Sequence, residues 1–247
     1  MFFKNISKKF SKLIKLLLNA STRKGLYYNI AASVELEELV KDLEVDTIID
    51  VGSNKGQFIL IIDKFFKNTK VLSFEPISEL LEIQKNFFVN RKNIRFFNFG
   101  VGSINSKIIL NITRQKDSSS ILEIEKKDKL GKKFDIIEKR QIDIKKLEDV
   151  VNSEKLNGSV LLKLDVQGYE LEVLKGAVNI LPKIKYIITE VAENQFYKNQ
   201  VTENVIIKYL NDKNFKIMKF TNIFKIENTN YIQKDVLLVN KLNIKND

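Results

Sequence analysis

The chain has 247 residues, 44% of them hydrophobic, which is enough to bury the core of a single α/β domain. It contains no cysteine and no histidine, which excludes disulfides, thiolate nucleophiles, Ser-His-Asp triads and the commonest metal ligand. The formal net charge of +11 would suit an anionic partner, but basic and acidic residues are interleaved along the chain without a nucleic-acid-binding motif, so we expect no nucleic acid as partner.

The first 33 residues are predicted to form a basic, amphipathic helical extension in front of one domain over residues 34–247. One helical face carries Ile6, Phe10, Leu13, Ile14, Leu17 and Leu18, with lysines elsewhere. Lysines interrupt every apolar run, so we predict neither a transmembrane span nor a signal peptide. We expect the helix to pack on its own domain, with peripheral contact to an anionic membrane through residues 1–20 as the alternative, in a cytoplasmic protein.

Helices and strands alternate from residue 34 onward. The first half predicts a helix in SVELEELVKDL, a buried strand over 47–51, a helix over 56–67, a strand in KVLSFEP, a helix over 78–90 capped by Ser78, and a third strand in IRFFNFGVG. Next come a strand in KIILNIT, a surface excursion in RQKDSSSILEIEKKDKLGKKFD and a strand in IIEKRQIDI that leads into KKLEDVV. The last part predicts strands in SVLLKLDV, KYIITEV, FKIMKF and DVLLVN, with helices in YELEVLKGAVNIL and ENVIIKYLNDKN. Continuous apolar strands separated by helices indicate a mostly parallel sheet covered on both faces, and the last two strands indicate a hairpin at one edge.

A ligand of such a sheet binds beyond the carboxyl ends of the strands. The first strand ends in Asp50 and a loop in which Gly52 permits a tight turn and Gly56 lets the next helix approach a ligand. Glu75 ends the second strand, where a carboxylate can accept hydrogen bonds from both hydroxyls of a ribose. Asn54 stands where a dinucleotide-binding loop needs its middle glycine, and no P-loop occurs. A nucleoside without phosphates, commonly S-adenosylmethionine, therefore fits best, with Asp50 available to its ammonium; the plainer alternative is that the two glycines only shape a turn.

A further strand end, LLKLDVQGYELEVLKGA, places Asp165 after a buried strand and Glu170 in the first turn of a helix. Structural roles are available to both, since Asp165 could cap the helix and Glu170 could interact with the helix dipole. Lys163 and Asp165 share one strand face, however, and a charged pair in an apolar strand is costly unless it is used. We therefore favour a functional role for Asp165 and leave Glu170 open.

Taken together, these segments resemble the FkbM family of S-adenosylmethionine-dependent methyltransferases. The matching pieces are IIDVGSNKGQF, VLSFEP, FFNFGVGS, DSSSI, LLKLDVQGYELEVLKGA and YIITEVAENQFY, which span about residues 47–200 in family order. The resemblance implies a class I methyltransferase (Rossmann-like) fold, with a seven-stranded, mostly parallel sheet and a C-terminal antiparallel hairpin. It also implies S-adenosylmethionine as cofactor and O-methylation of a sugar hydroxyl on a glycan or a glycosylated metabolite.

Residue by residue, the resemblance assigns a cofactor site to Asp50, Gly52, Ser53, Asn54, Gly56, Glu75, Pro76, Asn98 and Gly100. Glu75 would hold the ribose, and Asn98 and Gly100 would lie beside the adenine. Ser53 and Gly100 stand where the family often has alanine. RQKDSSS and ENQFYKNQ could supply acceptor contacts, for example through Phe196 or Tyr197.

A sugar hydroxyl needs a general base as its proton leaves. Without histidine, Asp165 is our first choice for that base, followed by Glu190, at the end of YIITE, and Glu170. A divalent cation held by Asp165 could instead lower the pKa of the hydroxyl, but we do not favour it.

Two further alternatives are methylation of a nitrogen or carboxylate on another small molecule, and a non-catalytic relative that binds nucleosides or glycans. Base methylation of nucleic acid is disfavoured because DVQG occupies the position where such enzymes commonly carry [DN]-P-P-[YF].

Overall fold

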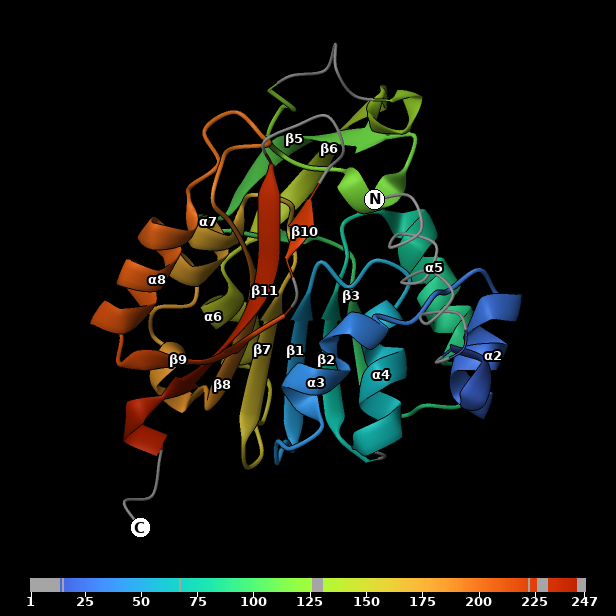
Figure 1. The fold of residues 1–247 in the computed structure, drawn as a ribbon, viewed down its shortest axis with the longest axis vertical. Coiled ribbons are helices and arrows are strands. Elements are labelled where there is room, and N and C mark those ends of the chain that lie inside the picture. Colours follow the sequence, from blue (N-terminus) through green and yellow to red (C-terminus); the bar gives the residue numbers. More distant parts are fainter. Residues whose placement is uncertain are drawn as a thin grey trace.

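A computed structural model describes residues 14, 16–66, 68–125, 131–221, 223–225 and 231–243. Its main sheet has eight strands, in the order β10-β11-β8-β7-β1-β2-β3, with β9 also paired to β11 (Figure 1). The strands are β1 (Thr47–Val51), β2 (Lys70–Phe74), β3 (Ile94–Phe97), β7 (Val160–Leu164), β8 (Tyr186–Ala192), β9 (Phe215–Phe220), β10 (Phe224–Lys225) and β11 (Ile232–Asn240). The five strands from β3 to β8 are parallel, whereas β9 and β10 both pair antiparallel with β11, which itself runs antiparallel to β8.

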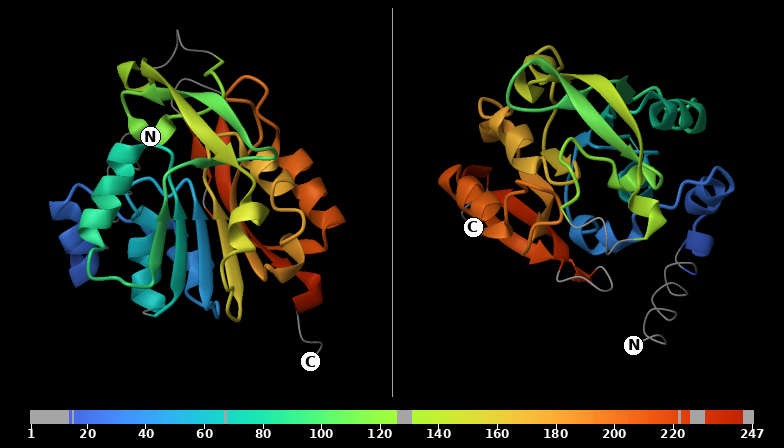
Figure 2. Two further views of the ribbon diagram at one scale, coloured as in Figure 1. Left: turned by 180° about the vertical axis from the view of Figure 1, so that it is seen from behind. Right: turned by 90° about the horizontal axis from the view of Figure 1, so that it is seen from above.

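Helices cover both faces of this sheet, as the continuous apolar strands predict (Figures 1 and 2). Every residue of β1 and β7 is buried. On one face, α3 (Glu37–Val40) and α4 (Gln57–Phe65) contribute to a core with Ile48, Leu161 and Leu237. On the other face, α6 (Leu147–Val151), α7 (Glu170–Lys175) and α8 (Glu203–Asp212) pack against residues such as Ile49 and Leu162. The predicted fold class is therefore confirmed, with the two-residue strand β10 as an addition to the seven expected strands.

A second, three-stranded sheet lies beyond the carboxyl ends of the main strands (Figure 2). It consists of β4 (Gly100–Val101), β5 (Ser106–Thr113) and β6 (Ile136–Lys145), in the order β4-β6-β5. The prediction of one strand across IRFFNFGVG was wrong, because the chain leaves the main sheet after Phe97 and β4 pairs with β6 instead. Ile77 and Leu80, at the start of α5 (Ser78–Phe87), pack on the apolar side of this sheet.

Most of the predicted N-terminal helix lies outside the described residues. The described portion includes α2 (Ala20–Tyr27), whose first amides are capped by the side chain of Asn19. Leu16, Ile30 and Ala32 are buried in the same core as α4. Among the described helices, none combines the length and apolar character that a membrane crossing requires. The boundary at residue 33 and the contact of residues 1–20 with a membrane stay predictions.

Candidate active site

The loop between β1 and α4 is shaped by three residues with positive φ: Gly52 (+78°), Asn54 (+51°) and Gly56 (+85°). At Gly52 a side chain is excluded on two grounds. The positive φ favours glycine, and a Cβ atom there would lie 1.9 Å from the backbone oxygen of Asp165. A Cβ at Gly56 would lie 2.6 Å from the ring of Phe88. Gly52 therefore allows the β1 loop to lie directly against the end of β7, so the two predicted halves of the site are in backbone contact.

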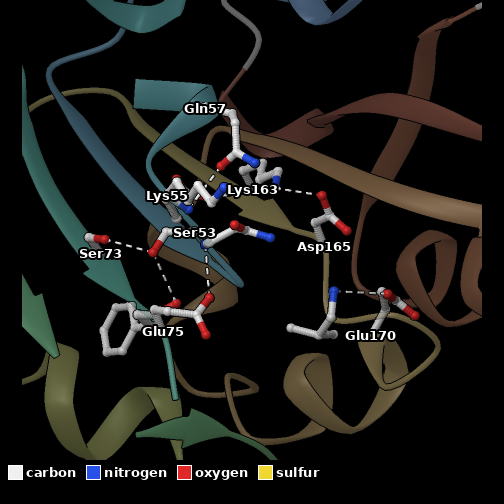
Figure 3. A network of polar contacts seen from close by, with 12 residues as sticks. Ser53, Lys55, Gln57, Ser73, Glu75, Lys163, Asp165 and Glu170 are labelled. Atoms are coloured by element: carbon white, nitrogen blue, oxygen red, sulfur yellow. Dashed lines mark hydrogen bonds and ion pairs between the residues drawn. The ribbon is translucent and has the colours of Figure 1, made fainter. Parts of the chain in front are cut away.

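Glu75 follows β2, and its carboxylate is buried beside the β1 loop (Figure 3). Its Oε2 accepts a hydrogen bond from the backbone N–H of Asn54 (2.8 Å), and its Oε1 accepts one from the N–H of Ile77 (2.8 Å). Burial raises the pKa of Glu75 to about 7, against the effect of these two hydrogen bonds. Each carboxylate oxygen retains a lone pair, so the group can still accept the two hydroxyls of a ribose.

Glu75 also explains why the predicted cap at Ser78 was wrong. Ser78 is the first residue of α5, and Ile77 precedes the helix without a side-chain cap of its own. The hydroxyl of Ser78 donates instead to Glu79 (3.0 Å). The carboxylate of Glu75 therefore satisfies an amide at the start of α5 and one in the β1 loop at the same time.

Asn98 and Gly100, the predicted neighbours of the adenine, follow β3. The amide of Asn98 donates to the carbonyl oxygens of Glu75 (2.9 Å) and Pro76 (3.1 Å), which joins the ends of β2 and β3. Gly100 is buried in β4, where a Cβ atom would lie 2.6 Å from the side chain of Ile144. Asn98 thus lies beside Glu75, whereas the small size of Gly100 is explained by packing of the second sheet.

Two residues that support the loop were missed by the sequence reasoning: Ser73 in β2 and Gln84 in α5. The hydroxyl of Ser73 lies 2.8 Å from Ser53 Oγ and 2.8 Å from Gln84 Oε1 (Figure 3). Gln84 Nε2 donates to Ser53 Oγ (2.8 Å) and to the carbonyl oxygen of Asn54. All of these side chains except Asn54 are buried. The sequence signal that could have identified them is a polar residue at a core position. Ser73 interrupts the apolar strand VLSFEP, and Gln84 lies on the apolar face of a helix.

Asp50, Lys163 and Asp165 form a charged row where β1 and β7 lie side by side. Lys163 Nζ lies 3.1 Å from Asp165 Oδ2 and 3.7 Å from Asp50 Oδ1. Burial acts to lower the pKa of Lys163, but the carboxylates of Asp165 and Asp50 outweigh it and raise that pKa above its usual value. Lys163 therefore stays charged, and the predicted pairing of Lys163 with Asp165 is present.

The two aspartates of this row differ in exposure. Asp50 is fully buried, and neither of its carboxylate oxygens accepts a hydrogen bond from the residues that the structure describes. Burial raises its pKa to about 6, with Lys163 opposing. The side chain of Asp165, by contrast, is 40% exposed. Asp50 is thus a buried carboxylate that accepts no hydrogen bond from the described residues, whereas the carboxylate of Asp165 is partly open to solvent.

Glu170 and Glu190, the other candidate bases, are both buried. Glu170 Oε1 accepts the backbone N–H groups of Val166 and Gly168, each at 3.1 Å, and burial raises its pKa to about 7 (Figure 3). Glu190 Oε2 accepts from Gln233 Nε2 (2.8 Å), and burial together with the nearby carboxylates of Asp165 and Glu170 raises its pKa well above normal. Glu170 thus holds the turn after β7. Because Glu170 and Glu190 are both buried, neither is as accessible as Asp165.

The suggestion that Phe196 or Tyr197 contacts a sugar stays a prediction. Both rings are buried in a cluster with Ile124, Phe134 and Tyr231. Burial of a ring in a loop requires partners far away in the chain, here the excursion between β5 and β6, and the local sequence does not reveal them.

Comparison with known proteins decides the family. The model of the FkbM methyltransferase domain matches residues 50–217, more than half of the chain. The chain belongs to the FkbM methyltransferase family. Methyltransferase 1 of Beauveria bassiana (strain ARSEF 2860) is 28% identical over 180 residues, which cover 62% of this chain and 71% of that protein. Methyltransferase sdnD of Sordaria araneosa is 29% identical over 153 residues, which cover 52% and 59%.

Solved structures agree on the fold of this FkbM methyltransferase. TehB from Haemophilus influenzae superposes with a TM-score of 0.50 at 11% identity, over 88% of this chain and 65% of that one. At this identity the likeness concerns the fold alone. The protein is a methyltransferase with the class I fold of S-adenosylmethionine-dependent enzymes.

The alternative role of Asp165 is to hold a metal ion. In the ranges that the structure describes, no group of three or more aspartate or glutamate side chains is arranged to hold a metal ion. Both oxygens of Asp165 already contact other side chains, Lys163 and Gln167. The geometry of this carboxylate therefore suits hydrogen bonding.

The buried acids of this FkbM methyltransferase predict an unusual dependence of stability on pH. The folded-state pKa is about 6 for Asp50 and about 7 for Glu75, Glu170 and Asp235, raised in each case by burial. Between about pH 4.5 and 7 the folded protein holds protons that the unfolded chain has released, so stability is lost as the pH rises through this window. The chain has no histidine to titrate there. We expect the free energy of unfolding without ligand to fall by about 2 kcal/mol or more between pH 5.5 and 8, measured by denaturant unfolding.

The matched variant for this measurement is Glu75→Gln, which removes one of the four titrating groups and should flatten the curve. A stability that rises steadily from pH 5.5 to 8 in the wild type would show that these carboxyls are ionised in the folded protein at low pH.

Proposed function

We propose that this FkbM methyltransferase binds S-adenosylmethionine at the β1 loop and Glu75 and methylates a sugar hydroxyl of a glycan or a glycosylated metabolite. The observation that carries the proposal is the contact at Gly52, where the β1 loop lies against the backbone of Asp165. It joins a nucleoside-type site to the carboxylate of Asp165, which is 40% exposed, whereas the other two candidate bases, Glu170 and Glu190, are buried.

The residues fit the cofactor in three respects. The buried carboxylate of Glu75 has lone pairs for the ribose hydroxyls and is fixed by two backbone amides. Asp50 is a buried carboxylate that accepts no hydrogen bond from the described residues, with Lys163 Nζ 3.7 Å away, and the ammonium of the cofactor would supply a donor. Gly52, Ser53 and Asn54 form a loop whose shape is held from beneath by Ser73 and Gln84.

The cofactor supplies an electrophilic methyl group, so the chain itself must bind, orient and deprotonate. Asp165 accepts the proton of the acceptor hydroxyl at its carboxylate. Lys163 keeps a positive charge 3.1 Å from that carboxylate. Glu170 holds the turn on which Asp165 stands.

Transfer of labelled methyl from S-adenosylmethionine to a panel of methyl glycosides and glycan precursors tests this proposal. We expect label in a product that survives mild alkali, as a methyl ether does. A product from which alkali releases the label as methanol would instead indicate carboxyl methylation, and label on an amine would indicate N-methylation. If S-adenosylhomocysteine binds but no acceptor of any class is labelled, the non-catalytic alternative is favoured.

A further inference from the structure

Gln167 lies two residues after Asp165, in the turn between β7 and α7. Its φ is +55°, in the left-handed region that residues other than glycine and asparagine rarely adopt. Such strained conformations persist when surrounding contacts fix them, and they are concentrated at functional sites. Gln167 therefore occupies a position where glycine would suit the backbone better.

The side chain of Gln167 contacts the proposed base directly. Its Nε2 donates to Asp165 Oδ1 at 2.8 Å, while Lys163 Nζ donates to Asp165 Oδ2 at 3.1 Å. Each oxygen of the carboxylate is thus held by a different donor. Because the side chain of Asp165 is 40% exposed, it has room to rotate, and a single donor would leave one oxygen free to swing.

Tyr197 and Asp165 together set the orientation of the Gln167 amide. The hydroxyl of Tyr197 lies 2.8 Å from Gln167 Oε1 and 3.2 Å from the carbonyl oxygen of Ser118, and its one proton at the shorter distance favours Oε1 facing Tyr197 and Nε2 facing the carboxylate. The Tyr197 ring is itself buried against Phe196. Tyr197 therefore belongs to a rigid support.

The backbone of Gln167 is anchored from the second sheet. Ser120, in the excursion between β5 and β6, donates through its hydroxyl to the carbonyl oxygen of Gln167 (2.7 Å). Ser120 is buried and also accepts the N–H of Leu122 (3.0 Å). The left-handed turn is thus held on its side chain by Tyr197 and on its carbonyl by Ser120.

We propose that Gln167 is a positioning residue, oriented by Tyr197, that holds the carboxylate of Asp165 in line for proton transfer. This inference rests on the proposed role of Asp165 as base. It gives a function to Gln167 in the DVQG motif and to Tyr197 in ENQFY.

Gln167→Gly is the decisive variant, since glycine relieves the positive φ and removes only the side chain. If Gln167 merely shaped the turn, this variant would fold at least as stably and work as well as the wild type. We expect instead a 10-fold to 100-fold lower kcat with methyl glycosides as acceptors, an unchanged Kd for S-adenosylhomocysteine and an unchanged or higher Tm. Tyr197→Phe, which frees the amide to flip, should lower kcat by a smaller factor.

Gln167→Glu tests the pH profile of kcat/KM, which a purely structural role of Gln167 would leave unchanged. It keeps an acceptor for Tyr197 but places a second carboxylate beside Asp165, so the acidic limb of kcat/KM should move to higher pH by about one unit. Without any acceptor, ¹⁵N NMR of the Gln167 side-chain amide reports the same geometry: its two N–H signals should lose their protection from solvent exchange in Asp165→Ala and in Tyr197→Phe.

Wild-type kcat and an unshifted pH profile in both Gln167 variants, or an amide signal indifferent to Asp165→Ala, would overturn the inference. The two proposals fail separately. If Asp165→Asn keeps its turnover, the base itself is wrongly assigned; if Asp165→Asn is inactive while Gln167→Gly is fully active, only the positioning role fails.

Discussion

Glu75→Ala is expected to weaken the binding of S-adenosylhomocysteine by about 100-fold to 10,000-fold. The carboxylate is buried beside the β1 loop and fixed by the amides of Asn54 and Ile77. Two hydrogen bonds from ribose hydroxyls to a charged acceptor contribute about 1.5–3 kcal/mol each, and each 1.4 kcal/mol corresponds to about tenfold in affinity. Isothermal titration calorimetry measures the loss directly.

The variant also removes the acceptor of two backbone amides, so its Tm must be measured beside its affinity. Glu82→Ala is the matched control, because Glu82 is an exposed carboxylate on α5, the helix that follows Glu75, and is paired with Lys85. It should bind like the wild type. An affinity of folded Glu75→Ala equal to that of the control would place the ribose elsewhere.

The pH dependence of binding gives a second view of the same group. Burial places the pKa of Glu75 at about 7 in the ligand-free protein, and the ionised form accepts both hydroxyls. Wild-type affinity for S-adenosylhomocysteine should therefore fall as the pH is lowered through 7, approaching tenfold per pH unit. Glu75→Gln should bind weakly at every pH and lack this dependence.

The parallel sheet and its cofactor loop were predictable because the signals are local. The observed strand Thr47–Val51 begins and ends at the predicted residues, since a short apolar run bounded by a glycine loop is compatible with few other structures. Glu75 could be placed for the same reason, because the carboxyl ends of neighbouring parallel strands meet at one edge of the sheet.

The second sheet was not predictable in the same way. Its strand β4 has only two residues, and its partner β6 begins 35 residues after β4 ends. Nothing in FFNFGVG distinguishes a long strand from one that breaks at Asn98 and changes sheets. Pairing at that distance depends on tertiary packing, which overrides local strand preference.

The candidate site shows the same division between residue identity and residue role. Asp165 and Glu170 were both found from their motif, but the two backbone amides that Glu170 accepts assign it to the turn. Tyr197 was suggested as an acceptor contact, and the structure shows that its hydroxyl contacts the side-chain amide of Gln167. Side-chain roles of this kind depend on which rotamer the packed core allows, and one sequence does not specify it.

Asp165→Asn is expected to lower kcat by 10²-fold to 10⁴-fold, the usual contribution of a general base, and to leave cofactor affinity within about threefold of the wild type. Asparagine has nearly the same shape, and the side chain is 40% exposed, so the fold should tolerate it. The amide cannot take the proton of the hydroxyl, whereas the proposed cofactor contacts, Glu75 and Asp50, are untouched. Single-turnover transfer of labelled methyl to methyl glycosides, beside calorimetry with S-adenosylhomocysteine, separates the two effects.

Glu190→Gln provides the comparison within the same group of acids. Glu190 is buried and accepts from Gln233, so its loss should change kcat by less than tenfold if Asp165 is the base. The reverse result, with Glu190→Gln inactive and Asp165→Asn active, would identify Glu190 in β8 as the base. If a chelator abolishes the wild-type activity and Mg²⁺ restores it, Asp165 would instead be assigned the role of binding a metal ion. An Asp165→Asn enzyme that is slow at every pH, with chelator-resistant wild-type turnover, leaves proton transfer to Asp165 as the step that the variant has lost.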